Sequence, residues 1–118
     1  MTPEQQEKCD LIATELMGWK KKFAFGSDLY AYFLNNQFIA WTDSWNPFKD
    51  WSDCGRVLDR LDELNLNHAH ERVALQDYEF CINNAGWERF VGAYAQDLKS
   101  AVCLAVLELI TKHPEVLR

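Results

Sequence analysis

The chain has 118 residues and a net charge of −6 at pH 7, and 48% of its residues are hydrophobic. This length supports one hydrophobic core, so we expect a single domain over residues 1–118, and the hydrophobic content excludes an intrinsically disordered chain. The excess of negative charge lies in residues 43–88, which hold ten acidic and four basic residues. Because nucleic-acid phosphates bind clusters of Lys and Arg, this charge argues against direct binding of nucleic acid.

The sequence also indicates a cellular compartment. Its first residues are polar, where a secretory signal would carry an apolar stretch, and no apolar run is long enough to span a bilayer. Four widely spaced cysteines, none in a CxxC pair, are typical of buried thiols in a reducing environment. We therefore expect a cytoplasmic protein that does not contact a membrane.

The first helix is expected over about residues 3–17. Thr2 suits the N-cap and Pro3 suits the first helical position, while Gly18 suits a left-handed end. Apolar residues recur along this segment at helical spacing, which predicts one buried face. These residues are Cys9, Ile12, Ala13 and Leu16.

A β-hairpin is expected next. Residues 29–34 and 37–42 are rich in aromatic and aliphatic residues and flank Asn35-Asn36, a pair that tolerates positive φ in a tight turn. Neither strand alternates cleanly between apolar and polar residues, so we expect both faces of the sheet to be covered. The residues between the first helix and this hairpin predict a loop with three lysines solvated beside the helix end. These lysines are Lys20, Lys21 and Lys22.

The second half of the chain predicts two more helices and two more strands. Asp50 suits the N-cap of a helix that ends near residue 65, with apolar residues along one side and charged residues along the other. Residues 78–82 and 88–95 predict two paired strands. The last helix, over about residues 97–112, is apolar nearly all round, which predicts that it is buried.

The fold class follows from these elements. Residues 68–76 predict a loop, with a short strand at residues 72–75 as the alternative. The order of elements is then roughly α-β-β-α-β-β-α, with a mostly antiparallel sheet. A sheet that is apolar on both faces needs helices on both sides. We therefore expect an α+β fold built as a three-layer α-β-α sandwich.

No motif in the sequence indicates catalysis. It contains neither a GxSxG nucleophile turn nor a Gly-rich phosphate loop. His68 and His70 have no third imidazole or thiolate nearby in the sequence to complete a metal site. We therefore expect these histidines in a solvated loop, and a protein that is not an enzyme and carries no metal or cofactor.

The stretch from Trp41 to Asp53 is the candidate recognition surface, because it holds three of the five tryptophans together with three aspartates. Its rings either seal the edge of the sheet or form a partly exposed patch, which in a soluble protein marks a partner or ligand site. The carboxylates here and in the following helix either cap and solubilise that helix or face a basic partner. The candidate binding residues are Trp41, Asp43, Trp45, Phe48, Asp50, Trp51, Asp53, Asp59, Asp62 and Glu63.

Three short motifs occur in the chain order of one known family. Residues 13–19 (ATELMGW) end the first helix, residues 46–50 (NPFKD) open the second, and residues 101–107 (AVCLAVL) lie in the last. In this the chain resembles the phage ABA sandwich domain family, whose members carry a V-M-G-W type motif, a P-S-T-D type segment and an A-I-x-x-A-L type helix. Leu16 replaces the usual Val, and Phe48-Lys49 replaces Ser-Thr. The resemblance implies an α-β-α sandwich and a phage or prophage source, and it implies no activity.

The function is expected by analogy. Small acidic phage proteins without catalytic residues often bind and block a host component, including CRISPR effectors whose basic nucleic-acid channels attract acidic surfaces. We therefore expect an anti-defence, anti-CRISPR-like protein that inhibits a basic host protein in the bacterial cytoplasm. One alternative is a sponge for a nucleotide signal, with Trp45 and Trp51 stacked on the base. Another is a virion assembly or dimerisation module, since an apolar last helix suits a homodimer.

Overall fold

The computed structural model describes residues 2–24, 26, 29–74, 77–84, 86 and 88–117. Within these residues the α-helices are α1 (Pro3–Leu11), α2 (Trp51–Glu63) and α3 (Leu98–Lys112). Sheet A is antiparallel and consists of β1 (Lys20–Phe23), β2 (Tyr30–Leu34) and β3 (Gln37–Trp41). Sheet B is also antiparallel and consists of β4 (Asn67–Ala74), β5 (Asp77–Asn83) and β6 (Arg89–Ala95).

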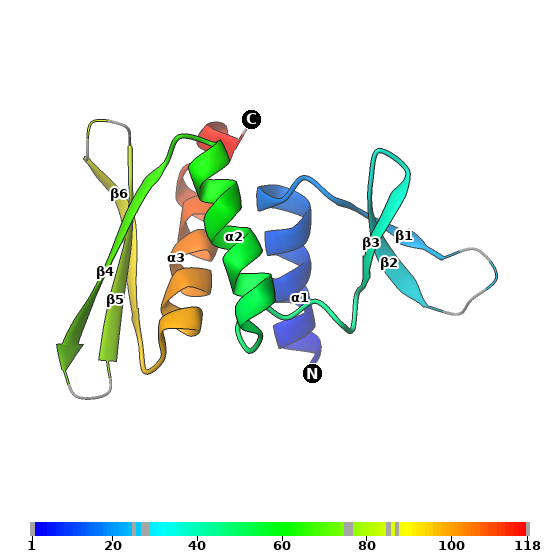
Figure 1. Ribbon diagram of the computed structural model, residues 1–118, viewed down its shortest axis with the longest axis horizontal. Coiled ribbons are helices and arrows are strands. Elements are labelled where there is room, and N and C mark those ends of the chain that lie inside the picture. The colour runs from blue at the N-terminus through cyan, green and yellow to red at the C-terminus, as the bar shows by residue number, and fades with distance from the viewer. Residues whose placement is uncertain are drawn as a thin grey trace.

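The helices lie between the two sheets, which stand at opposite ends of the long axis of the molecule (Figure 1). The protein is 47 Å long and 22 Å thick. The α+β class is confirmed. The predicted order of elements is wrong, because each expected pair of strands is a set of three. The predicted α-β-α sandwich around one sheet is not confirmed.

The two strands that the sequence did not predict are β1 and most of β4. β1 carries three consecutive lysines, and β4 reads NHAHERVA, so neither shows the apolar pattern of a strand. Pairing decides both elements: Lys22 pairs with Ala31 of β2, and His70 pairs with Phe80 of β5. The loops predicted at residues 19–28 and 68–76 are therefore wrong where β1 and β4 lie, because backbone pairing with a neighbour outweighs weak local propensity.

The first helix begins as predicted and ends in a wider turn. Thr2 caps α1, and its side chain accepts a hydrogen bond from the backbone N–H of Gln5. The helix continues as a π-helix, η1 (Ile12–Leu16), and ends before Gly18, whose φ is +73°. This end brings the next residue, Trp19, into the core, where its side chain is 6% exposed.

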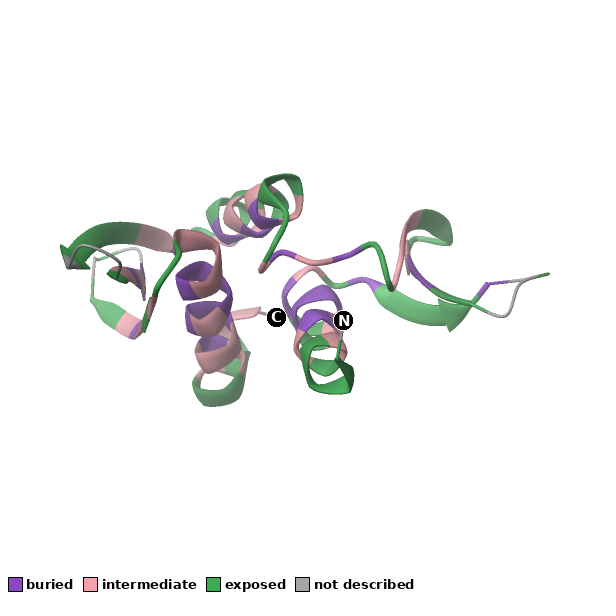
Figure 2. Cartoon of the chain, turned by 90° about the horizontal axis from the view of Figure 1, so that it is seen from below, coloured by how far each residue is buried: buried purple, intermediate pink, exposed green. Residues whose placement is uncertain are grey.

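The core lies among the helices and extends to sheet B on one side and to Tyr32 of sheet A on the other. α3 contacts β5, β6, α2 and η1, and most of its apolar residues are buried, as predicted (Figure 2). Phe80, Ile82 and Val91 face it from sheet B. Cys9 and Cys54 are also buried as free thiols, and burial raises the pKa of each to about 11. None of the described helices is long and apolar enough to cross a bilayer.

Sheet A meets the helices with one face only. Tyr32 is fully buried, with its ring centroid 5.9 Å from that of Trp19, and its hydroxyl donates a hydrogen bond to Asp10 of α1. Lys21 donates to the same carboxylate at 2.7 Å. On the opposite face Phe38 is 50% exposed. The prediction that both faces of this sheet are covered is therefore wrong.

Candidate functional site

Trp45, the central tryptophan of the predicted recognition stretch, is a core residue. Its side chain is fully buried, and its indole packs edge-on against Trp19 with ring centroids 4.7 Å apart. The indole N–H donates a hydrogen bond to the backbone oxygen of Cys9 at 3.0 Å. A buried indole usually has such a partner. A partner could therefore touch Trp45 only if the core opened.

Three further candidates shape the start of α2. Asp50 is the N-cap, and its carboxylate accepts a hydrogen bond from the backbone N–H of Asp53. Asp53 in turn accepts one from the backbone N–H of Asn46 at 2.9 Å. Burial raises the pKa of Asp53, and the hydrogen bond from Asn46 opposes that rise. Phe48 is half-buried and packs against the core.

Trp51 is the exposed tryptophan of the stretch. It is the first residue of α2, and its side chain is 55% exposed. The ammonium of Lys99, from the start of α3, lies 4.4 Å from the centroid of its ring, a cation–π contact. A hollow of about 210 Å³ adjoins this contact and is lined by Phe48, Lys49, Asp97, Lys99 and Ser100.

The remaining carboxylates of the prediction lie at the surface of α2. Asp59, Asp62 and Glu63 are exposed, while the apolar side of the helix packs in the core. Asp62 lies 3.1 Å from Nε2 of His68, and Glu63 accepts from the Arg60 guanidinium at 3.0 Å. Asp59 has no ion pair among the described residues. The structure thus brings these three carboxylates together on one helix face.

The two histidines were predicted to lie in a solvated loop, and Asp43 is the last aspartate of the predicted binding residues. His68 and His70 belong to β4 rather than to a loop, and His68 stacks on Phe80 with ring centroids 5.5 Å apart. Within the part of the chain that the structure describes, no three His, Cys, Asp or Glu side chains are grouped to hold a metal ion. Asp43 is exposed in the turn after β3.

Trp41, also a predicted binding residue, belongs to a second surface, which was not predicted as a whole. Successive residues of a strand point to opposite faces, so the neighbours of buried Tyr32 point away from the helices. One row of cross-strand neighbours on this side is Lys20, Phe33 and Phe38, and the next is Lys22, Ala31 and Trp41. We call this side of the sheet the outer face of sheet A.

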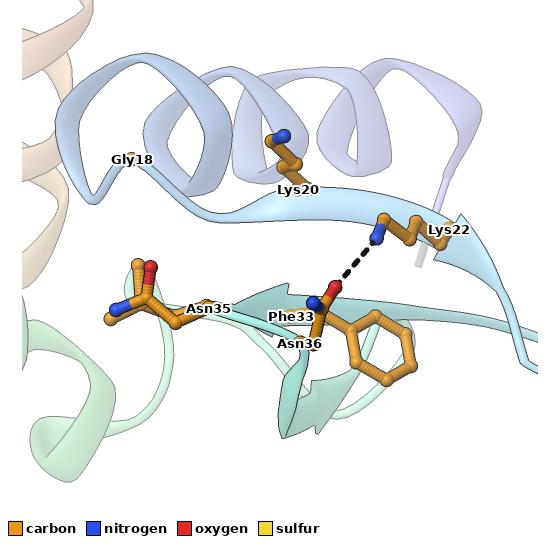
Figure 3. Close-up of a pocket in the computed structure, with 7 residues that line it drawn as sticks. Gly18, Lys20, Lys22, Phe33, Asn35 and Asn36 are labelled. Carbon is orange, nitrogen blue, oxygen red and sulfur yellow. Dashed lines mark hydrogen bonds between the residues drawn. The ribbon is translucent and has the colours of Figure 1, made fainter.

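The rings on the outer face of sheet A form one cluster. The centroid of Phe38 lies 6.0 Å from that of Phe33 and 5.2 Å from that of Trp41, and both contacts are edge-to-face. The ammonium of Lys22 lies 5.9 Å from the centroid of Phe33. Between β1 and the β2–β3 turn is a pocket of about 250 Å³ (Figure 3). Its lining residues are Gly18, Lys20, Lys22, Phe33, Leu34, Asn35 and Asn36.

Part of this outer face had a signal in the sequence. A two-residue turn at Asn35-Asn36 fixes the register of the hairpin, so Phe33 and Phe38 must be cross-strand neighbours. The two lysines had no such signal, because β1 is recognisable only by its pairing with β2.

Comparison with known protein families, with curated proteins and with solved structures gave no match to this chain.

Proposed function

We propose that this protein is a binding protein, not an enzyme, and that it inhibits a host component through the exposed face of α2. The single observation that carries this proposal is Trp51, which is 55% exposed on the same helix as three exposed carboxylates. Tryptophans are enriched among the residues that dominate the energy of protein interfaces. The carboxylates are Asp59, Asp62 and Glu63.

The geometry of α2 supports a continuous contact surface. At 3.6 residues per turn, Trp51 and Asp62 lie on the same side of the helix, about three turns and about 16 Å apart. Asp59 and Glu63 lie beside this line. The opposite side carries the buried residues Cys54, Val57 and Leu61. A partner can therefore dock on α2 without opening the core.

The negative charge on this face favours a basic partner, and the three carboxylates do not contribute equally to the attraction. Glu63 is bound by Arg60, whose guanidinium also donates to the backbone oxygen of Leu16 at 3.0 Å. Asp59 and Asp62 are not matched by an arginine or lysine contact within the described residues. We therefore assign most of the electrostatic attraction to these two aspartates, and most of the apolar contact to Trp51.

The nature of the partner is part of the proposal. The resemblance to the phage ABA sandwich domain family implies a phage source, and a phage protein would meet its partner in the cytoplasm of the bacterial host. An acidic surface fits a basic, nucleic-acid-binding effector of host defence. The proposed activity is thus anti-defence, in the manner of an anti-CRISPR protein.

The test is capture of partners from a bacterial lysate, read by mass spectrometry, and then affinity measured on the captured protein. The charge reversal Asp59→Lys with Asp62→Lys should weaken binding about tenfold or more, because steering and contact both depend on these charges. Binding should also weaken as salt is raised, because ions screen exposed charges. Equal binding of the reversed variant, or undiminished binding in about 1 M salt, contradicts the proposal.

Two control variants separate charge from structure. Glu7→Lys with Glu15→Lys reverses two exposed charges on the first helix and should leave binding nearly unchanged. Asp50→Ser removes a charge beside Trp51 but keeps a side chain that caps helices well. If Asp50→Ser binds normally while Asp50→Ala is less stable, Asp50 acts as a cap rather than as a contact.

The structure bears on both alternatives from the sequence. A nucleotide sponge that stacks a base between Trp45 and Trp51 would need the buried Trp45. The hollow beside Trp51 is lined by Lys49 and Lys99 but also by Asp97. Dimerisation through the last helix would need a free apolar surface, but most apolar residues of α3 pack against sheet B, α2 and η1. Neither alternative gains support at these positions.

A further inference from the structure

The outer face of sheet A has the features of a second binding site, which does not depend on α2. In a chain of net charge −6, this face presents two lysines on alternate residues of one strand. The side chain of Lys20 makes no hydrogen bond or ion pair with any described residue, and the ammonium of Lys22 donates a hydrogen bond to the side-chain oxygen of Asn36 at 3.3 Å (Figure 3). Two lysines on the same side of a strand, neither paired with a carboxylate among the described residues, attract an anion.

The lysines lie around a hollow rather than on a flat surface. They line the pocket of about 250 Å³ together with the side chains of the turn residues Asn35 and Asn36. Both asparagines have positive φ, +51° and +65°, which fixes the tight turn that closes the pocket. An asparagine amide donates hydrogen bonds, and lysine is a frequent phosphate ligand. The polar groups of the pocket therefore suit a phosphate.

An aromatic surface continues from this pocket. Phe33 forms part of the pocket wall, and its ring meets that of Phe38, which meets Trp41. Phe38 is half-exposed, whereas Lys22 lies over Phe33. A planar base can therefore pack on Phe38 while its phosphate occupies the pocket, which is the combination that proteins use to hold single nucleotides and single strands.

The carboxylate that pairs with β1 does not face this pocket. Asp10, the carboxylate nearest to Lys21, lies on the inner side of the sheet and is already bound by Lys21 and Tyr32. Asp43 follows β3 at the end away from the turn. Sheet B lies at the far end of the molecule (Figure 1). Charges separated by more than about 8–10 Å are largely screened at physiological salt.

We propose that the pocket between β1 and the β2–β3 turn binds the phosphate of a nucleotide, whose base packs on Phe38 and Trp41. The nucleotide is either free or part of a single strand, since both present the same phosphate and base. This site is separate from α2, so it can fail or succeed without changing the proposal for that helix.

The experiment is a titration of the full chain followed by backbone amide NMR signals, with four separate probes. These are ATP, inorganic pyrophosphate, a short thymidine oligonucleotide and a short glutamate peptide. ATP should shift the signals of residues 18–22 and 33–38, and pyrophosphate should shift mainly those beside the pocket. If the oligonucleotide binds more tightly than ATP, the ligand is a single strand. If ATP binds more tightly than the oligonucleotide, the ligand is a free nucleotide.

Matched variants decide the result. Lys20→Gln with Lys22→Gln should weaken ATP binding about tenfold or more, because both ammonium groups are lost. Lys8→Gln with Lys112→Gln removes two ion-paired lysines of the helices and should change nothing at the pocket. Phe38→Ala should weaken ATP binding but not pyrophosphate binding. The proposal is overturned if ATP causes no shift, if the shifts centre on Trp51, or if the glutamate peptide binds as well as ATP.

Discussion

Sheet A and sheet B have the same number of strands in the same order, yet they contribute unequally to the core. Sheet B contributes Phe80, Ile82 and Val91, each at most 4% exposed, to its contact with α3. Sheet A contributes Tyr32 to the core as a fully buried residue, whereas Phe23, Tyr30 and Phe38 are each about half-exposed. Sheet B is thus part of the packed scaffold, whereas sheet A is attached to the scaffold and mostly exposed.

The outer faces of the two sheets differ in chemistry as well. On sheet B, Glu79 pairs across the strands with Tyr94, and Arg89 lies 3.5 Å from its carboxylate. The hydrogen bond from Tyr94 is the main reason that the pKa of Glu79 is lowered. This is the polar outer face that an antiparallel sheet at the surface normally has. The aromatic outer face of sheet A departs from that pattern, which is why we assign a ligand to it.

The largest expected effect tests the role of sheet B. Phe80→Ala should lower the free energy of unfolding by about 3–5 kcal/mol, because it leaves a cavity in a close-packed core. The measurement is denaturant unfolding followed by circular dichroism. A loss below about 1 kcal/mol would mean that sheet B is not the scaffold that its burial indicates.

An intermediate effect tests how sheet A is held. The carboxylate of Asp10 accepts hydrogen bonds from Gln6, Lys21 and Tyr32. Asp10→Ala should cost about 1–3 kcal/mol, because it leaves partly buried donors without an acceptor. Amide hydrogen exchange should then accelerate more in β1–β3 than in β5, because local opening of sheet A adds to the global loss of stability. Equal acceleration in both sheets would contradict the separate attachment of sheet A.

Because of the carboxylate of Asp10, we expect the stability of the fold to depend on pH. Burial alone would raise the pKa of Asp10, but hydrogen bonds from Lys21, Tyr32 and Gln6 lower it below the ordinary 3.8. The ionised form therefore stabilises the fold fully above about pH 4, and this contribution is lost as the pH falls through the lowered pKa. Asp10→Asn should be less stable at pH 7, and its stability should fall less steeply below pH 4. Parallel curves for the two proteins would refute this role.

The smallest expected effect is on the outer face of sheet A. Phe38→Ala should change the free energy of unfolding by about 0.5 kcal/mol or less, because half of the side chain is already in water. The measurement is thermal unfolding of Phe38→Ala and of Phe80→Ala under the same conditions. A cost near that of Phe80→Ala would show that the outer ring cluster supports the fold.

Most helices and strands were predictable, since their signals are local. The capping residues Thr2 and Asp50, the apolar spacing of the helices, and the turn at Asn35-Asn36 place the elements within a few residues. β1 and β4 were not predictable, because lysines and histidines are poor strand signals. The candidate site was predictable only in part: Trp51 and the carboxylates of α2 are exposed, whereas Trp45 is in the core.

By itself, the sequence determined the α+β class, the approximate start and end of the three α-helices, and the total charge of the protein. The tertiary structure decided which of the neighbouring tryptophans is buried and which is exposed, and where the charges lie. The physical reason is that burial depends on which surfaces meet. Trp19 reaches Trp45 only because η1 and Gly18 redirect the chain, and Lys20 and Lys22 share a face with Phe33 only because β1 pairs with β2.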